Sequence, residues 1–189
     1  MDLKLDASVA EFFQGLISST IKNQGVDTSE PTECYLVNLL AAFSNTTVDD
    51  EPLALKMASA MEASPDERAR HLKEVGDTSL YVSGFFAESL QRKLVDVDYY
   101  IQMGGAAYSE LAGYFRGYRR SEVFGEVYDE LGQKFPRFVD VLAEISEQTS
   151  CTSNLSLVQL YERWLRTGSE WMERRLREHG VIPKKSELQ

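Results

Sequence analysis

Apolar residues recur at intervals of three and four along most of this 189-residue chain. That spacing places side chains on one face of an α-helix, and no stretch alternates apolar and polar residues for long enough to predict a strand. The most regular run begins at Phe124 and continues through Ile145. We therefore predict an all-α protein with about seven or eight helices, over approximately residues 8–23, 29–44, 50–62, 64–75, 77–94, 96–117, 121–148 and 155–179.

Short polar connections indicate where these helices begin and end. Gly25 follows the first helix as a candidate C-cap, and Asp96 precedes a later helix as a candidate N-cap. Gly76 followed by Asp77 predicts that one helix ends and the next begins at this point. Pro136 lies inside the longest apolar run, where it should kink the helix or restart it, because proline removes one backbone hydrogen bond.

Helices joined by short connections favour a mostly antiparallel bundle, in which the amphipathic stripes pack against one another. A chain of 189 residues can bury a core without disulfides or metals, so residues 1–182 are expected to form a single domain. Gly180 and Pro183 end the last predicted helix, and residues 183–189 are predicted to be a mobile tail.

The formal net charge of -10 and the pI near 4.8 narrow the possible partners. Phosphate backbones are bound by clustered Lys and Arg, so the acidic balance disfavours DNA and RNA. The sequence contains neither a run of about eighteen apolar residues nor a basic-then-apolar leader, so we expect no membrane span and no secretion. Cys34 and Cys151 lack a CxxC spacing, which fits reduced thiols, and a cytoplasmic location is predicted.

The motifs that carry catalysis or cofactors in other proteins are missing from this sequence. The only histidines are His71 and His179, and neither belongs to the Glu-x-x-His pattern of di-iron bundles. There is no Gly-x-Ser-x-Gly elbow, and Gly104-Gly105 lacks the lysine and the strand context of a nucleotide-binding loop. We therefore expect no metal and no cofactor, and a non-enzymatic protein is favoured.

Residues 76–120 depart from ordinary helical composition, because they hold six of the nine tyrosines and six of the twelve glycines. Small residues beneath tyrosines build either a closely packed helix seam or the wall of a ligand pocket, and both alternatives stay open. In a pocket, a carboxylate beside a phenol could acquire a raised pKa and act as an acid or base. The candidate ligand-binding residues are Tyr81, Phe85, Glu88, Asp98, Tyr99, Tyr100, Gly104, Gly105 and Tyr108.

The last predicted helix offers a second candidate surface. Trp164 and Trp171 lie two helical turns apart and therefore share one face, beside an arginine-rich face. This stripe could form the seam of a homodimer, with its arginines pairing with acidic helices of another subunit. The alternative is that both tryptophans pack within their own chain.

Two functional hypotheses are compatible with these patterns. The first is a cytoplasmic adaptor or regulatory module, without enzymatic activity, that acts through protein–protein contacts and could form a homodimer. The second is a helical-bundle protein or enzyme that binds a small aromatic or amphipathic molecule within residues 76–120. The missing catalytic motifs favour the first hypothesis, with neither nucleic acid nor membrane as a partner.

Overall fold

A computed structural model confirms that the protein is all-helical. It describes residues 2–44, 51–85, 96–116, 121–149, 161, 164–165, 168–178 and 180–182, and there is no β-strand among them. The helices are α1 Asp2–Gln24, α2 Glu30–Ser44, α3 Leu53–Glu62, α4 Pro65–Phe85, α6 Val97–Phe115, α7 Glu122–Gln133, α8 Phe135–Gln148 and α10 Glu170–Glu178. The predicted tail, residues 183–189, and the candidate Glu88 lie outside the described residues. In the described part, each helix is too short or too polar to cross a membrane.

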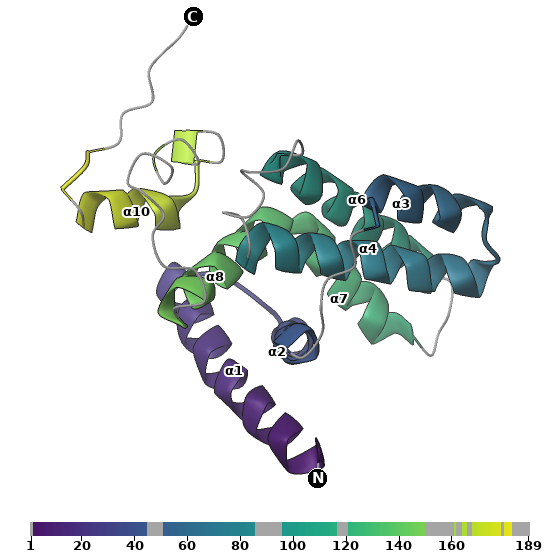
Figure 1. Cartoon of the computed structure of the whole chain (residues 1–189), viewed down its shortest axis with the longest axis horizontal. Coiled ribbons are helices and arrows are strands. Elements are labelled where there is room, and N and C mark those ends of the chain that lie inside the picture. Colours follow the sequence, from purple (N-terminus) through teal and green to yellow (C-terminus); the bar gives the residue numbers. More distant parts are fainter. Residues whose placement is uncertain are drawn as a thin grey trace, which may run out of the picture.

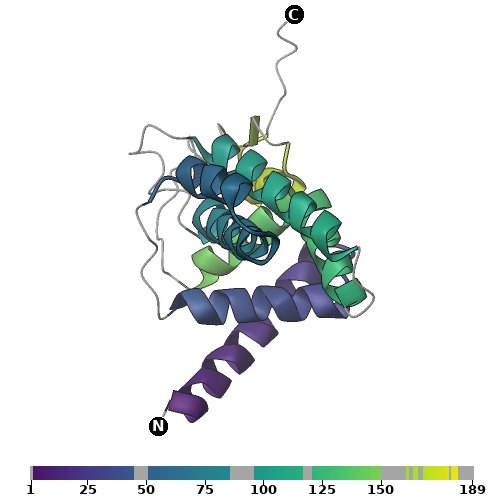
Figure 2. The same cartoon turned by 90° about the vertical axis from the view of Figure 1, so that its right-hand side faces the viewer.

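Helix α4 is the centre of the bundle (Figure 1). It contacts α2, α3, α6 and α8, and α6 in turn contacts α7. At one end of the α4–α6 seam Asp66 meets Tyr114, and further along Ser79 meets Gly104, so these two helices are antiparallel. Helix α1 packs on α2 and α8, and Figure 2 shows it extending away from the bundle toward the N-terminus.

Apolar residues of the described chain form one main core and smaller clusters. The main core is contributed by α1, α2, α3, α4, α6, α7 and α8, and Tyr108, Phe135 and Phe138 are among its largest fully buried side chains. The second core is small and joins α8 to the C-terminal part of the chain; its buried members are Ala143, Trp164, Trp171, Met172 and Leu176. The C-terminal helix α10 therefore docks on α8 through apolar packing of its own.

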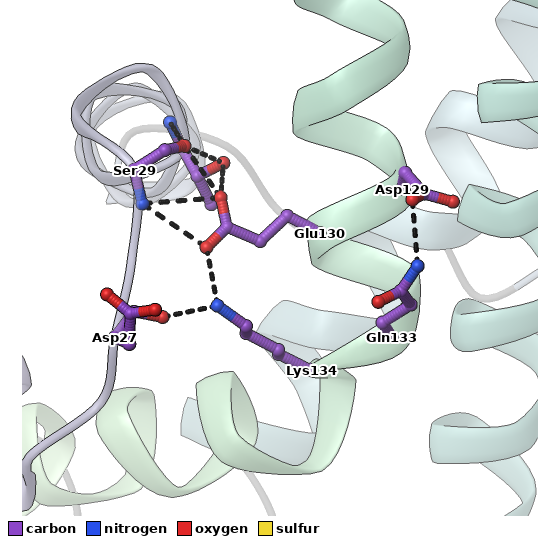
Figure 3. A network of polar contacts seen from close by, with 7 residues as sticks. Asp27, Ser29, Asp129, Glu130, Gln133 and Lys134 are labelled. Carbon is purple, nitrogen blue, oxygen red and sulfur yellow. Dashed lines mark hydrogen bonds and ion pairs between the residues drawn. The ribbon is translucent and has the colours of Figure 1, made fainter.

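One carboxylate joins the start of α2 to the end of α7 (Figure 3). Glu130 accepts hydrogen bonds from the hydroxyls of Ser29 and Thr32, both at 2.6 Å. Lys134 Nζ donates to Glu130 at 2.9 Å and also to the backbone carbonyl of Asp27. Burial alone would raise the pKa of Glu130, but these hydrogen bonds lower its pKa below the ordinary value. A charged carboxylate thus lies at the positive end of α2, where it is favourable.

Several predicted boundaries are confirmed. Gly25 ends α1 with a φ of 65°, the left-handed conformation that glycine adopts without strain. Asp96 caps α6, because its Oδ1 accepts a hydrogen bond at 2.7 Å from the first backbone N–H of the helix. The interruption near Pro136 is a break between α7 and α8, with the proline in the first turn of α8.

The predicted boundary at Gly76 is wrong. Helix α4 continues through Gly76 and Asp77 to Phe85. A Cβ atom at position 76 would lie 2.6 Å from Cδ1 of Tyr108, so the ring of Tyr108 occupies the space that any larger residue would need. Glycine here permits the close approach of α6 and does not end a helix.

The single helix predicted over residues 155–179 is also wrong. Gly168 has a φ of 64°, which a continuous right-handed helix cannot contain. The next residue, Ser169, immediately precedes α10 and caps it, because its Oγ accepts a hydrogen bond from the backbone N–H of Met172 at 3.4 Å. The Gly-Ser pair is therefore a helix stop followed by a helix start.

Candidate functional site

Asp77 is the polar centre of residues 76–120. Its Oδ1 accepts hydrogen bonds from the hydroxyl of Tyr35 at 2.5 Å and from that of Tyr108 at 2.7 Å. Its Oδ2 pairs with Nζ of Lys73, one turn earlier on α4, at 2.5 Å. A single carboxylate therefore links α2, α4 and α6, in place of the helix cap that the sequence predicted for this residue.

The phenols around Asp77 stay neutral. Burial raises the pKa of Tyr108 well above its ordinary value, and the charge of Asp77 raises it further. The same two causes raise the pKa of Tyr35. Burial also raises the pKa of Tyr128, whose ring stacks on that of Tyr108 with 5.9 Å between centroids. Phenols of this kind donate hydrogen bonds but keep their protons near neutral pH, so they do not act as general bases.

The predicted ligand-binding residues are divided among three places in the fold. Tyr81 and Phe85 stack near the end of α4, with 5.5 Å between centroids, and Tyr81 also stacks on Phe43 of α2. Three half-buried candidates share the first turn of α6: Asp98, Tyr99 and Tyr100. The remaining described candidates lie in the middle of α6: Gly104, Gly105 and Tyr108.

Gly104 and Gly105 have different surroundings. A Cβ atom at Gly104 would lie 2.5 Å from Cβ of Ser79 and 2.7 Å from Cε2 of Phe135, whereas at Gly105 the nearest atom would be 3.7 Å away. Tyr108, one turn later, is fully buried. The contacts at Gly104 therefore support the packed-seam alternative for this part of α6.

The two tryptophans predicted for an interface are buried within the chain. Trp164 and Trp171 are each 4% exposed and belong to the second core. The start of α10 is held on α8 by Ser169, whose hydroxyl donates to Oδ2 of Asp140 at 2.5 Å. These contacts support packing within the chain, because both indole rings are buried in a cluster that includes Ala143 of α8.

A groove of about 420 Å³ lies at the end of the bundle where α3 ends, α4 begins and α6 ends. The junction of α3 and α4 is on the right of Figure 1. Two polar contacts join α4 to α6 there. Arg68 pairs with Glu110 at 2.8 Å, and the hydroxyl of Tyr114 donates to Asp66 at 2.7 Å. The residues that line the groove are Ala63, Pro65, Arg68, Leu72, Glu110 and Tyr114.

A row of aromatic rings continues from this groove to α7. The rings of Tyr114 and Phe115 meet edge to face with 5.2 Å between centroids, and Phe115 lies 6.1 Å from Phe124. Phe124 is 54% exposed, and Val123 beside it is 57% exposed. We call the groove and these three rings the aromatic end of the bundle.

Sequence patterns placed Phe124 on the apolar face of its helix, and the structure leaves it exposed. The reason is its position in the first turn of α7, where Phe115 covers one side of the ring. The rest of that turn has exposed residues at Glu122 and Val123. No signal in the sequence distinguishes an apolar residue one turn inside the core from one at its margin.

The described residues do not bring three or more His, Cys, Asp or Glu side chains together in a group that could hold a metal ion. The candidate site is therefore an apolar and aromatic surface with a few ionic contacts. Comparison of the chain with known protein families, with curated proteins and with solved structures finds no match.

Proposed function

We propose that this chain is a non-enzymatic helical module that binds a partner protein at its aromatic end. The observation that supports the proposal is the exposure of Phe124, whose ring is in contact with Phe115 and, through it, continuous with the groove. Exposed apolar surface of this kind is typical of protein interaction sites. Burying it against a partner contributes about 25 cal/mol per Å² of apolar area.

The groove has the form that accepts one apolar side chain of a partner helix. Leu72 forms its apolar base and is 2% exposed, while Ala63 and Pro65 lie at the junction of α3 and α4. Amphipathic helices bind such grooves through apolar residues spaced three or four apart. The groove would take one of these residues, and the rings of Phe115 and Phe124 would cover the next turn.

The second hypothesis, a small-molecule site within residues 76–120, has less support. Gly104 is packed against Phe135 and Ser79, and the hydroxyl of Tyr108 is hydrogen-bonded to Asp77. Both residues were central to the pocket alternative.

A cytoplasmic location is part of the proposal. Cys34 on α2 is exposed and does not form a disulfide. Exposed thiols persist in the reducing cytoplasm and are less common in oxidising compartments.

Site-specific photo-crosslinking tests the proposed function. A photoreactive phenylalanine analogue replaces Phe124 in one variant and Phe12 in another, because these two phenylalanines have nearly equal exposure, 54% and 56%. The expected result is a defined crosslinked species from position 124 in cells and none from position 12. Equal crosslinking from both positions, or none from position 124, would contradict the proposal.

The partner found in this way is then purified and its affinity measured by calorimetry. Phe124→Ser should weaken binding at least about tenfold, which corresponds to about 1.4 kcal/mol. Phe12→Ser should leave the affinity unchanged, and circular dichroism checks that both variants are folded. Unchanged affinity for Phe124→Ser would remove the aromatic end from the interface.

A further inference from the structure

We infer that the segment bound at the aromatic end is a cationic amphipathic helix, an inference that rests on the proposed function and specifies its partner. Helices α3 and α6 both end at the groove, and neither has a basic residue in its last turn. The C-terminal end of a helix carries a partial negative charge, which favours a nearby cation.

Helix α4 begins at the same place, and its positive end already has carboxylates beside it. Asp66 and Glu67 lie in its first turn. Glu67 accepts a hydrogen bond from the Ser64 hydroxyl at 2.7 Å, and this bond lowers the pKa of Glu67. The positive end of α4 therefore does not offset the two negative helix ends.

The side chains around the groove add to this negative field. Arg68 and Glu110 are the charged residues that line the groove. Glu62, Asp66 and Glu67 lie next in sequence to lining residues, and the other described cations nearby are Arg70 and Arg116. Arg68 is paired with Glu110 at 2.8 Å, and Arg116 at the end of α6 is paired with Asp129. Arg119 and Arg120 follow in the sequence, outside the described residues. The whole chain carries a net charge of -10, so its long-range field also attracts cations.

The apolar features give the rest of the partner's pattern. One apolar residue enters the groove over Leu72, and others one or two turns away cover Phe115 and Phe124. Lysine or arginine residues on the flanks of that stripe then face Glu62 and the two helix ends. Apolar contacts give affinity, and the charges give orientation and a faster association.

Two synthetic helical peptides test the inference. Both carry leucines at the same three-and-four spacing, and the polar face is lysine in one and glutamate in the other. Fluorescence anisotropy of the labelled peptides with the full chain should show binding of the leucine–lysine peptide, at least about tenfold tighter than the leucine–glutamate peptide. Raising the salt from about 0.05 to about 0.3 M should weaken that binding, since salt screens charge.

Matched variants distinguish the aromatic end from general attraction to an acidic protein. Glu62→Lys and Glu11→Lys change the net charge equally, and both residues are exposed, but only Glu62 is next in sequence to a residue that lines the groove, Ala63. Glu62→Lys should weaken binding of the leucine–lysine peptide several-fold more than Glu11→Lys. Phe124→Ser should weaken it more than Phe12→Ser does.

Other outcomes overturn the inference in distinct ways. Equal effects of Glu62→Lys and Glu11→Lys mean that only net charge attracts the peptide. Tighter binding of the leucine–glutamate peptide assigns the opposite charge to the partner, and the proposed interaction site then stands without this inference. Light scattering could instead show that the chain is a dimer. If Phe124→Ser converts that dimer to monomers and Phe12→Ser does not, a second copy of the chain is the occupant.

Discussion

Gly104 and Gly113 lie on the same helix and show how differently two glycines can act. A side chain at Gly104 would collide with Ser79 and Phe135, while a Cβ atom at Gly113 would have no atom within 4 Å. The first glycine is required by packing between helices. The second only adds backbone entropy to the unfolded chain.

Alanine substitutions at these two positions should therefore have opposite effects. Gly104→Ala should destabilise the protein by about 1–3 kcal/mol through overpacking. Gly113→Ala should stabilise it by about 0.5–1 kcal/mol, because alanine favours the helix. Urea unfolding followed by circular dichroism measures both, and the second variant is the control for the first. A neutral Gly104→Ala would show that the seam at Ser79 can open without cost.

The buried phenols set how the protein responds to alkaline pH. Burial and the charge of Asp77 raise the pKa of Tyr35 and of Tyr108 above the value of about 10 that they have in the unfolded chain. Because their folded pKa is the higher one, their contribution to stability is complete below about pH 10 and is lost as the pH rises above it.

The free energy of unfolding should accordingly fall as the pH rises above about 10. Absorbance at the wavelength of ionised tyrosine should show a group of tyrosines, Tyr35 and Tyr108 among them, that ionises only as the helices unfold. Tyr108→Phe should remove part of this group. Ionisation of all nine tyrosines before any loss of helical signal would contradict this account.

At the scale of the helices, local signals predicted some boundaries and failed at others. Asp96 and Gly25 act within their own helix ends, so the sequence alone identified them. Gly76 followed by Asp77 has the same appearance in sequence, but both residues serve contacts with α6, and Asp77 also contacts α2. Contacts between distant segments are not encoded in a short window, and they override the local preference.

The contribution of the start of α10 to stability can be measured separately from that of the main bundle. Both tryptophans of the chain lie in the second core, so tryptophan fluorescence reports on that core alone. Ser169→Ala removes a helix cap, worth about 1 kcal/mol, and a hydroxyl donor to the buried Asp140, worth about 1–3 kcal/mol.

For Ser169→Ala, the unfolding transition followed by fluorescence should occur at a lower urea concentration than the transition followed by circular dichroism. The control is Ser44→Ala at the exposed end of α2, which should move neither transition. If both signals of Ser169→Ala shift together, the two cores unfold as one cooperative unit.

For the molecule as a whole, the sequence predicted an all-helical, mostly antiparallel bundle but not its exposed surface. Helical periodicity identifies which face of a helix is apolar, and this was sufficient for the fold class. The aromatic end combines residues 63–72 with Glu110, Tyr114, Phe115 and Phe124, which come together only when α6 packs on α4 and α7. Its recognition needed the packed structure, because no property of Phe124 or Tyr114 in isolation marks them as neighbours of a groove.

The C-terminal end of α1 also meets α8 and α10. Arg174 of α10 donates to the backbone carbonyl of Asn23 at 2.9 Å, and Gln24 donates to Glu144 at 2.7 Å. Since a ribosome releases the N-terminal helix first, α1 must wait for α8 and α10 to emerge before it can form these contacts. Helix α2 can cover part of α1 as soon as it has been made, but the part of α1 that packs on α8 stays exposed to water until α8 is complete.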